Sequence, residues 1–126
     1  MMTDFSKKYT ASDREMMSFV QHNKTMGDVY LVPIKMQDFR LATGAPIYVD
    51  FKSIPYKDTD VLDWHRRQRL AGKFYRTNDC NLLAGFALED GITHVVLEAS
   101  DPAHECPALH EFYIDANYGV YRISSP

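Results

Sequence analysis

The chain has 126 residues, close to the commonest size of a single domain, and we predict that residues 1–126 form one domain. Hydrophobic residues make up 45% of the sequence, which is enough to build a core and excludes a wholly disordered chain. The net charge of −3 argues against a nucleic-acid-binding protein, since such proteins usually carry a basic surplus. We expect a soluble domain without a signal peptide, because no apolar run approaches the roughly 20 residues that span a bilayer.

The N-terminal part of the sequence predicts a helix behind a flexible start. Residues 1–10 are polar, and we expect them to be flexible. Ser12 and Glu15 have the spacing of a capping box, in which each residue satisfies a backbone amide of the first helical turn. We therefore predict a helix from Ser12 to about Asn23.

Two strands and a long helix follow in the prediction. The apolar run Val29–Pro33 is bounded by turn signals and predicts a buried strand. In Pro46–Lys52, apolar and polar residues alternate, which is the period of a second strand. Asp58 is a good N-cap residue for a helix over Thr59–Arg76.

The long helix carries an ion pair at the edge of its apolar stripe. Trp64 belongs to that stripe, and we interpret it as core packing rather than as a platform for a sugar ring. Asp63 and Arg67 lie four residues apart beside it, so we predict that they form a structural ion pair. The opposite side carries three residues that we expect to form a solvated face: His65, Arg66 and Arg69.

The C-terminal half predicts one more helix, a third buried strand and a hairpin. The helix covers Cys80–Glu89 and the strand Thr93–Leu97, and the hairpin joins Leu109–Asp115 to Gly119–Ile123. Strands that alternate with helices favour a parallel sheet covered on both faces. We therefore predict an α/β fold: a three-layer Rossmann-like domain with a mostly parallel sheet and an antiparallel hairpin at its C-terminal edge.

Several short motifs follow one another in a recognisable order. They are Val29–Pro33, Phe39-Arg40, Val49–Tyr56, Trp64 with Arg67, Gly91–Val96 and Val120–Ile123. In this order the chain resembles the small extracytoplasmic α/β domain that follows the transmembrane helices of many bacterial polytopic membrane proteins, including glycosyltransferase-like ones. The resemblance implies an accessory domain outside the cytoplasm, because the transferase chemistry of such proteins resides in their membrane portion.

Charged side chains gather where the predicted strands end. Ligands of open parallel sheets bind beyond the carboxyl ends of the strands. We predict a polar crevice there, in which basic residues hold a phosphate or carboxylate, Asp50 accepts hydroxyls and a loop tyrosine is exposed. Its residues are Arg40, Asp50, Lys52, Tyr56 and Arg67; Lys35, Glu98 and Asp101 lie at the same edge. The alternative is an ion-pair network that ties this turn to the long helix.

Metal and cofactor sites are not predicted. His104, Cys106 and His110 are close in sequence, but their spacing matches no standard zinc pattern. His94 lies in a strand and is expected to be a hydrogen-bonded core residue. Cys80 and Cys106 are expected to be reduced thiols in the cytosol, with a bridge possible in an oxidising compartment.

Three functions remain open from the sequence. The leading hypothesis is a non-catalytic accessory or binding domain of a bacterial envelope protein, with glycosyl transfer as the associated process. Its partner would be a membrane-embedded protein region, a glycan or an anionic small molecule. The second is a small enzyme, or a sugar-phosphate-binding protein, that uses the crevice around Asp50, Lys52 and Arg67. The third is an assembly module that forms a homodimer through the C-terminal edge strand.

Overall fold

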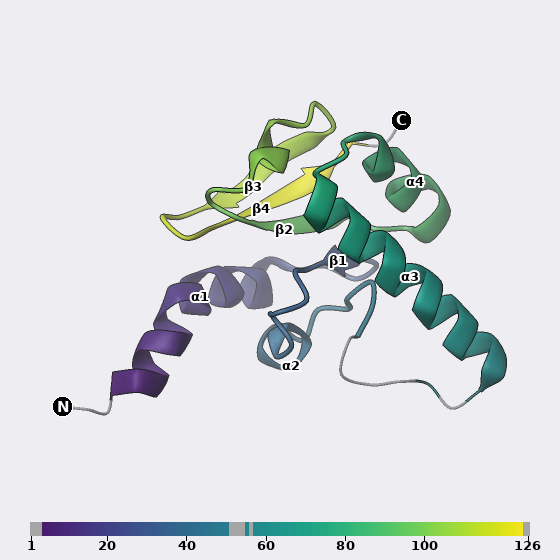
Figure 1. Ribbon diagram of the computed structural model, residues 1–126. Coiled ribbons are helices and arrows are strands. Elements are labelled where there is room, and N and C mark those ends of the chain that lie inside the picture. Colours follow the sequence, from purple (N-terminus) through teal and green to yellow (C-terminus); the bar gives the residue numbers. More distant parts are fainter. Residues whose placement is uncertain (1–3, 51–54, 56, 125–126) are drawn as a thin grey trace.

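The structure is a computed structural model that describes residues 4–50, 55 and 57–124 (Figure 1). The described chain contains helices α1 (Asp4–Asn23), α2 (Phe39–Thr43), α3 (Asp58–Thr77) and α4 (Asn81–Asp90), and the short 3-10 helix η1 (Pro102–Glu105). Its strands are β1 (Tyr30–Leu31), β2 (His94–Glu98), β3 (Leu109–Ile114) and β4 (Tyr118–Ile123). They form a single mixed sheet with the order β1-β2-β4-β3.

The helices cover both faces of this sheet. Because side chains alternate along a strand, each face meets its own hydrophobic cluster. On one face, Leu31 and Val95 pack with Phe74 of α3 and Phe86 of α4. On the other face, Tyr30, Val96 and Val120 pack with three residues of α1 and α2: Met16, Val20 and Phe39. Figure 1 shows the long helix α3 crossing in front of the sheet.

The predicted Rossmann-like fold with a mostly parallel sheet is wrong. Only β1 and β2 are parallel, while β4 pairs antiparallel with both β2 and β3. The physical reason is that the C-terminal hairpin does not stay at the edge. Its second strand inserts beside β2, where five residue pairs from His94↔Arg122 to Glu98↔Tyr118 align. Antiparallel pairing therefore dominates the sheet.

The predicted strand Pro46–Lys52 is also absent from the described residues, apart from a single bridge. Ile47 pairs in parallel with Tyr30, where the Tyr48 amide donates to the Tyr30 carbonyl over 2.8 Å. Pro33 has no amide hydrogen, so β1 cannot extend the ladder through that residue. Residues 51 and 52 lie outside the described residues.

The three predicted helices are present, and their boundaries differ from the predictions by at most one residue except at the start of α1. Helix α1 begins at Asp4, so the predicted start at Ser12 lies inside it. The N-cap of α3 is Lys57, and Asp58 opens the first helical turn instead. Gly91 ends α4 in the left-handed conformation with φ 71°, which glycine adopts without a steric penalty.

A disulfide joins Cys80 at the start of α4 to Cys106 after η1. Of the two states that the sequence left open, the structure therefore has the bridge and not the two reduced thiols. Sequence spacing gave no indication, because the residues are 26 positions apart and only the fold brings their Cα atoms to 5.5 Å. Cys80 is exposed and Cys106 is buried among core residues. The bond fastens α4 to the loop that precedes β3.

Candidate functional site

Two residues of the predicted crevice, Asp50 and Arg67, line an open hollow of about 340 Å³ beside the start of α3, which we call the Asp50 hollow. Arg40 of α2 is not among its described lining residues, but its Nη2 lies 3.2 Å from Asp50 Oδ2. Lys52 and Tyr56 lie outside the described residues, so their predicted roles stay predictions. Of the described residues that line the hollow, three are acidic and one is basic: Asp50, Asp60, Asp63 and Arg67. These side chains favour a cation there over an anion.

Arg67 is held by the protein itself. Its Nη1 donates to the Tyr48 carbonyl over 2.9 Å, and its guanidinium lies over the Tyr48 ring, 5.0 Å from the centroid. Its Nε lies 2.9 Å from Asp63 Oδ2, so the predicted ion pair is present. The two side chains are 34% and 46% exposed, which makes the pair half-buried rather than buried.

Two neighbouring side chains of α3, Trp64 and Arg66, also make polar contacts within the protein. Trp64 is partly buried against the core, and its Nε1 donates to the Asp50 carbonyl over 2.8 Å. Arg66 was expected on a solvated face, yet its Nη2 lies 3.0 Å from both Asp63 and Asp90. The Arg66 hydrogen bond is the main reason that the pKa of Asp63 is lowered, with Arg67 contributing as well. These contacts form a network that ties residues 48–50 to the helix.

Truncation of Arg67 tests this structural role. We expect Arg67→Ala to lower the free energy of unfolding by about 1–2 kcal/mol, because it removes a backbone hydrogen bond and a half-exposed ion pair. The loss stays below that of a broken buried pair, since Asp63 keeps Arg66 and solvent as partners. A urea titration measures the change. A value within error of the wild type would show that the contacts of Arg67 do not stabilise the fold.

The remaining predicted residues at the strand ends also have partners. Lys35 Nζ pairs with Glu98 Oε2, and hydrogen bonding to that carboxylate raises the pKa of Lys35. Asp101 is the N-cap of η1 and accepts from the Ala103 amide over 2.9 Å. The carboxyl-end edge of the parallel pair is therefore occupied by contacts within the protein.

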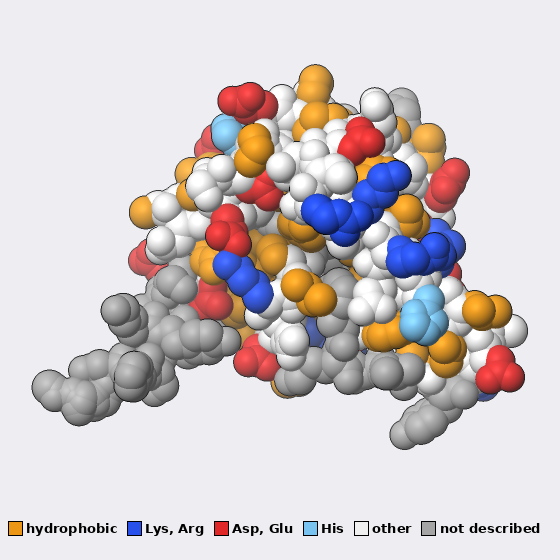
Figure 2. Space-filling model, in the orientation of Figure 1, with side chains coloured by type: hydrophobic (Ala, Val, Ile, Leu, Met, Phe, Trp, Pro, Cys, Tyr) orange, Lys and Arg blue, Asp and Glu red, His pale blue; other side chains and the backbone are white. Residues whose placement is uncertain are grey.

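A larger groove of about 1060 Å³ runs along the C-terminal half of α3, and we call it the α3 groove. Its basic lining residues are Arg66, Arg69, Lys73 and Arg76, and none of its described lining residues is acidic. Figure 2 shows blue side chains following this helix. Ile34, which is 55% exposed, and Leu70 supply apolar wall. The positive charge of the groove contrasts with the net charge of −3 of the whole chain.

Three of the four cations have no ion pair in the described part of the chain: Arg69, Lys73 and Arg76. All three are exposed. Gly72 lies between them, and a Cβ at this position would meet nothing within 4 Å. The middle of the α3 groove is therefore open space, bordered by cations that can accept an external anion.

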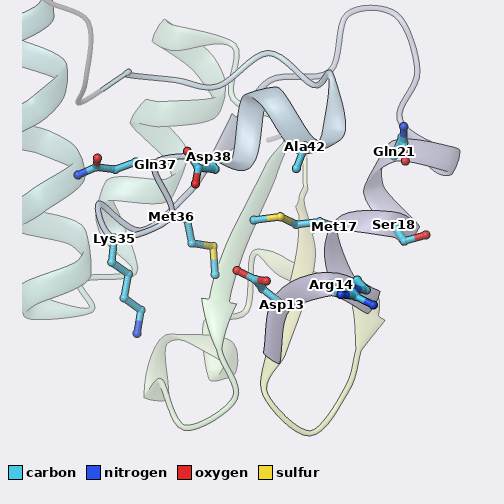
Figure 3. Close-up of a pocket in the computed structure, with 10 residues that line it drawn as sticks. All are labelled: Asp13, Arg14, Met17, Ser18, Gln21, Lys35, Met36, Gln37, Asp38 and Ala42. Carbon is cyan, nitrogen blue, oxygen red and sulfur yellow. The ribbon is translucent and has the colours of Figure 1, made fainter. Parts of the chain in front are cut away.

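A second pocket, of about 710 Å³, lies between α1 and the segment that leads into α2. Figure 3 shows Met17 and Met36 pointing into it, together with the Asp13 carboxylate. Burial is the main cause of a raised pKa at Asp13, and the Asp38 charge adds to it. This α1–α2 pocket has charges of both signs, since Arg14 and Lys35 also line it, whereas the charged residues in the described lining of the α3 groove are all basic.

The α3 groove was missed in the sequence because Arg69 was assigned to a solvated face and Lys73 and Arg76 were not considered. Their spacing of i, i+4 and i+7 places them on one stripe of a helix, and that signal was available. The contribution of Ile34 could not be inferred from this spacing, because Ile34 lies far from these residues along the chain. Among the described residues, no three His, Cys, Asp or Glu side chains gather in a way that could hold a metal ion.

Comparison with protein families matches the N-terminal part of the chain. Residues 11–71 are similar to a family described as a domain of unknown function, DUF6798, and this span is just under half of the chain. It includes most of α1, all of β1 and α2, and α3 as far as Ala71. No curated protein and no solved structure matches the chain. In the described residues, no helix has both the length and the apolar character to cross a bilayer.

Proposed function

We propose that this domain is a non-catalytic binding module that holds an anionic ligand in the α3 groove. The observation that carries the proposal is the row of three exposed cations without an ion pair in the described structure, in a groove without an acidic lining residue. Burying part of an anion beside several cations is favourable, whereas the cations alone repel one another. The ligand class is the anionic one expected from the sequence, but its place on α3 differs from the predicted crevice.

The disulfide supports a location outside the cytoplasm. Such bonds form and persist in oxidising compartments and are rare in the reducing cytosol. The Cys80–Cys106 bond thus agrees with the extracytoplasmic location that the resemblance implied. We include that location in the proposal. The association with glycosyl transfer stays a prediction, since no contact among the described residues bears on it.

A thermal-shift experiment with tripolyphosphate tests the binding site. A ligand that binds only the native state stabilises it, by about 1.4 kcal/mol at ten times the dissociation constant. For a domain of this size we expect the melting temperature to rise by roughly 4–6 °C. The double variant Arg69→Gln/Lys73→Gln should lose most of this rise. The matched control Arg14→Gln/Lys57→Gln removes the same charge from exposed residues elsewhere and should keep it.

A second variant fills the α3 groove without changing its charge. Gly72→Leu places a side chain in the open space above the helix, and it should raise stability slightly because glycine is a poor helix former. We expect it to abolish the tripolyphosphate shift. Gly85→Leu on α4 is the control, since its Cβ also meets nothing within 4 Å. An equal shift in wild type, Gly72→Leu and the charge variant would contradict the proposed site.

A further inference from the structure

We infer that the ligand of the α3 groove is a linear polyanion that runs along the helix, with successive charged groups at Arg69, Lys73 and Arg76. This inference rests on the proposed function and specifies its ligand. It depends on three observations: the axial spacing of the cations, the absence of acidic residues from the described lining, and the contacts that hold the one aromatic ring in that lining.

The spacing of the cations favours an extended ligand. At a rise of 1.5 Å per residue, Arg69 and Arg76 are separated by about 10 Å along the helix axis, with Lys73 between them. Their angular positions differ by less than one quarter of a turn, so the row is nearly straight. A single phosphate or carboxylate is smaller than this span. A chain with a charged group on each unit can contact all three cations at once.

Arg66 marks one end of the row. Its guanidinium is already neutralised by Asp63 and Asp90, at 3.0 Å from each carboxylate. It is therefore a poor partner for a fourth anionic group. The free positive charge lies on the C-terminal side of Arg66, which places the polyanion over the last three turns of α3.

The aromatic ring of the groove is fixed by the sheet, which argues against a nucleic acid. Tyr75 is the one aromatic residue in its described lining, and the Tyr75 hydroxyl lies 2.8 Å from the Val96 carbonyl and 3.1 Å from the Leu31 carbonyl. Proteins that bind single strands stack bases on aromatic faces. With its hydroxyl anchored between β1 and β2, Tyr75 is not a free stacking platform. A polyanion without bases fits the site better.

A length series tests the inference on the intact, oxidised protein. Calorimetry would compare orthophosphate, pyrophosphate, tripolyphosphate and a longer linear polyphosphate at one ionic strength. We expect affinity to increase at each step up to tripolyphosphate and then to level off, since three cations are available. For tripolyphosphate, each of Arg69→Gln, Lys73→Gln and Arg76→Gln should weaken binding about three-fold and lower the slope of log affinity against log salt by about one.

The possible failures are distinct. Equal affinity for orthophosphate and tripolyphosphate would overturn the polyanion and leave the anion site in place. No binding by any member would overturn both the polyanion and the proposed function. Anionic phospholipid vesicles or single-stranded DNA that bind more tightly than the longer polyphosphate, with the same loss in Arg69→Gln, would overturn the inference in favour of a membrane surface or a nucleic acid.

Discussion

Removal of the Cys80–Cys106 disulfide is expected to lower the free energy of unfolding by about 3.5 kcal/mol, the value that loop-closure entropy gives for a loop of this length. The bond joins residues 26 positions apart, so its loss frees a large part of the unfolded chain. It also releases α4 from the loop before β3. Urea titrations with and without reductant measure the difference.

A Cys80→Ala/Cys106→Ala variant separates the covalent bond from side reactions of the reductant. It should be as unstable as the reduced wild type, and reductant should not change it further. If the oxidised and reduced wild type unfold at the same urea concentration, the bond does not constrain the fold. The support that it gives to an extracytoplasmic location would then also be lost.

Acid is expected to destabilise the protein through His94, a core residue of β2. His94 is fully buried, and its ring is stacked on that of Tyr30 with a centroid distance of 4.5 Å. Its Nδ1 lies 2.7 Å from Thr93 Oγ1, while Nε2 has no hydrogen-bond partner among the described residues. Burial lowers the pKa of His94 to about 4, and the Arg122 charge acts in the same direction while Asp28 opposes it.

The sign of the effect follows from this lowered pKa. Above pH 6.5 the histidine is neutral in both the folded and the unfolded chain, so its contribution to stability does not change with pH. Between pH 6.5 and 4 the unfolded chain binds a proton that the folded chain rejects. The free energy of unfolding should therefore fall by about 3 kcal/mol across this window.

His94→Phe is the control, because a phenyl ring can stack on Tyr30 but does not titrate. We expect this variant to show a much flatter dependence of stability on pH between 6.5 and 4, whatever its absolute stability. The measurement is the urea midpoint at several pH values. Parallel pH profiles for wild type and variant would show that His94 accepts its proton without cost in the folded state.

The local elements could be predicted from the sequence, and the sheet could not. Helix α3 was predicted over Thr59–Arg76 and is observed over Asp58–Thr77, because its apolar stripe and acidic first turn are local signals. The C-terminal hairpin could also be predicted, because its two strands and the turn between them are local signals as well. The insertion of β4 beside β2 depends on pairing between distant residues, for which a single sequence has no local signal. The disulfide likewise joins two residues that lie 26 positions apart and that only the fold brings together.

In the candidate site, too, some features follow from local sequence and others depend on the fold. The Asp63–Arg67 ion pair follows from helical spacing and is observed. The predicted crevice assumed parallel strand ends that carry free charges, but Arg40 and Lys35 are paired with Asp50 and Glu98. The α3 groove needs Ile34 beside residues 66–76, and this contact exists only in the folded chain.

The most direct measurement for the central claim is a two-dimensional amide NMR titration of the oxidised protein with tripolyphosphate. We predict chemical-shift changes concentrated on Arg69–Arg76 of α3 and on Ile34, with little change in α1 or at the Asp50 hollow. In the same titration of Gly72→Leu, the chemical shifts of these residues should not change. Shifts that gather around Asp50 and Arg40, or no shifts at a concentration that stabilises the protein, would contradict an anion site in the α3 groove.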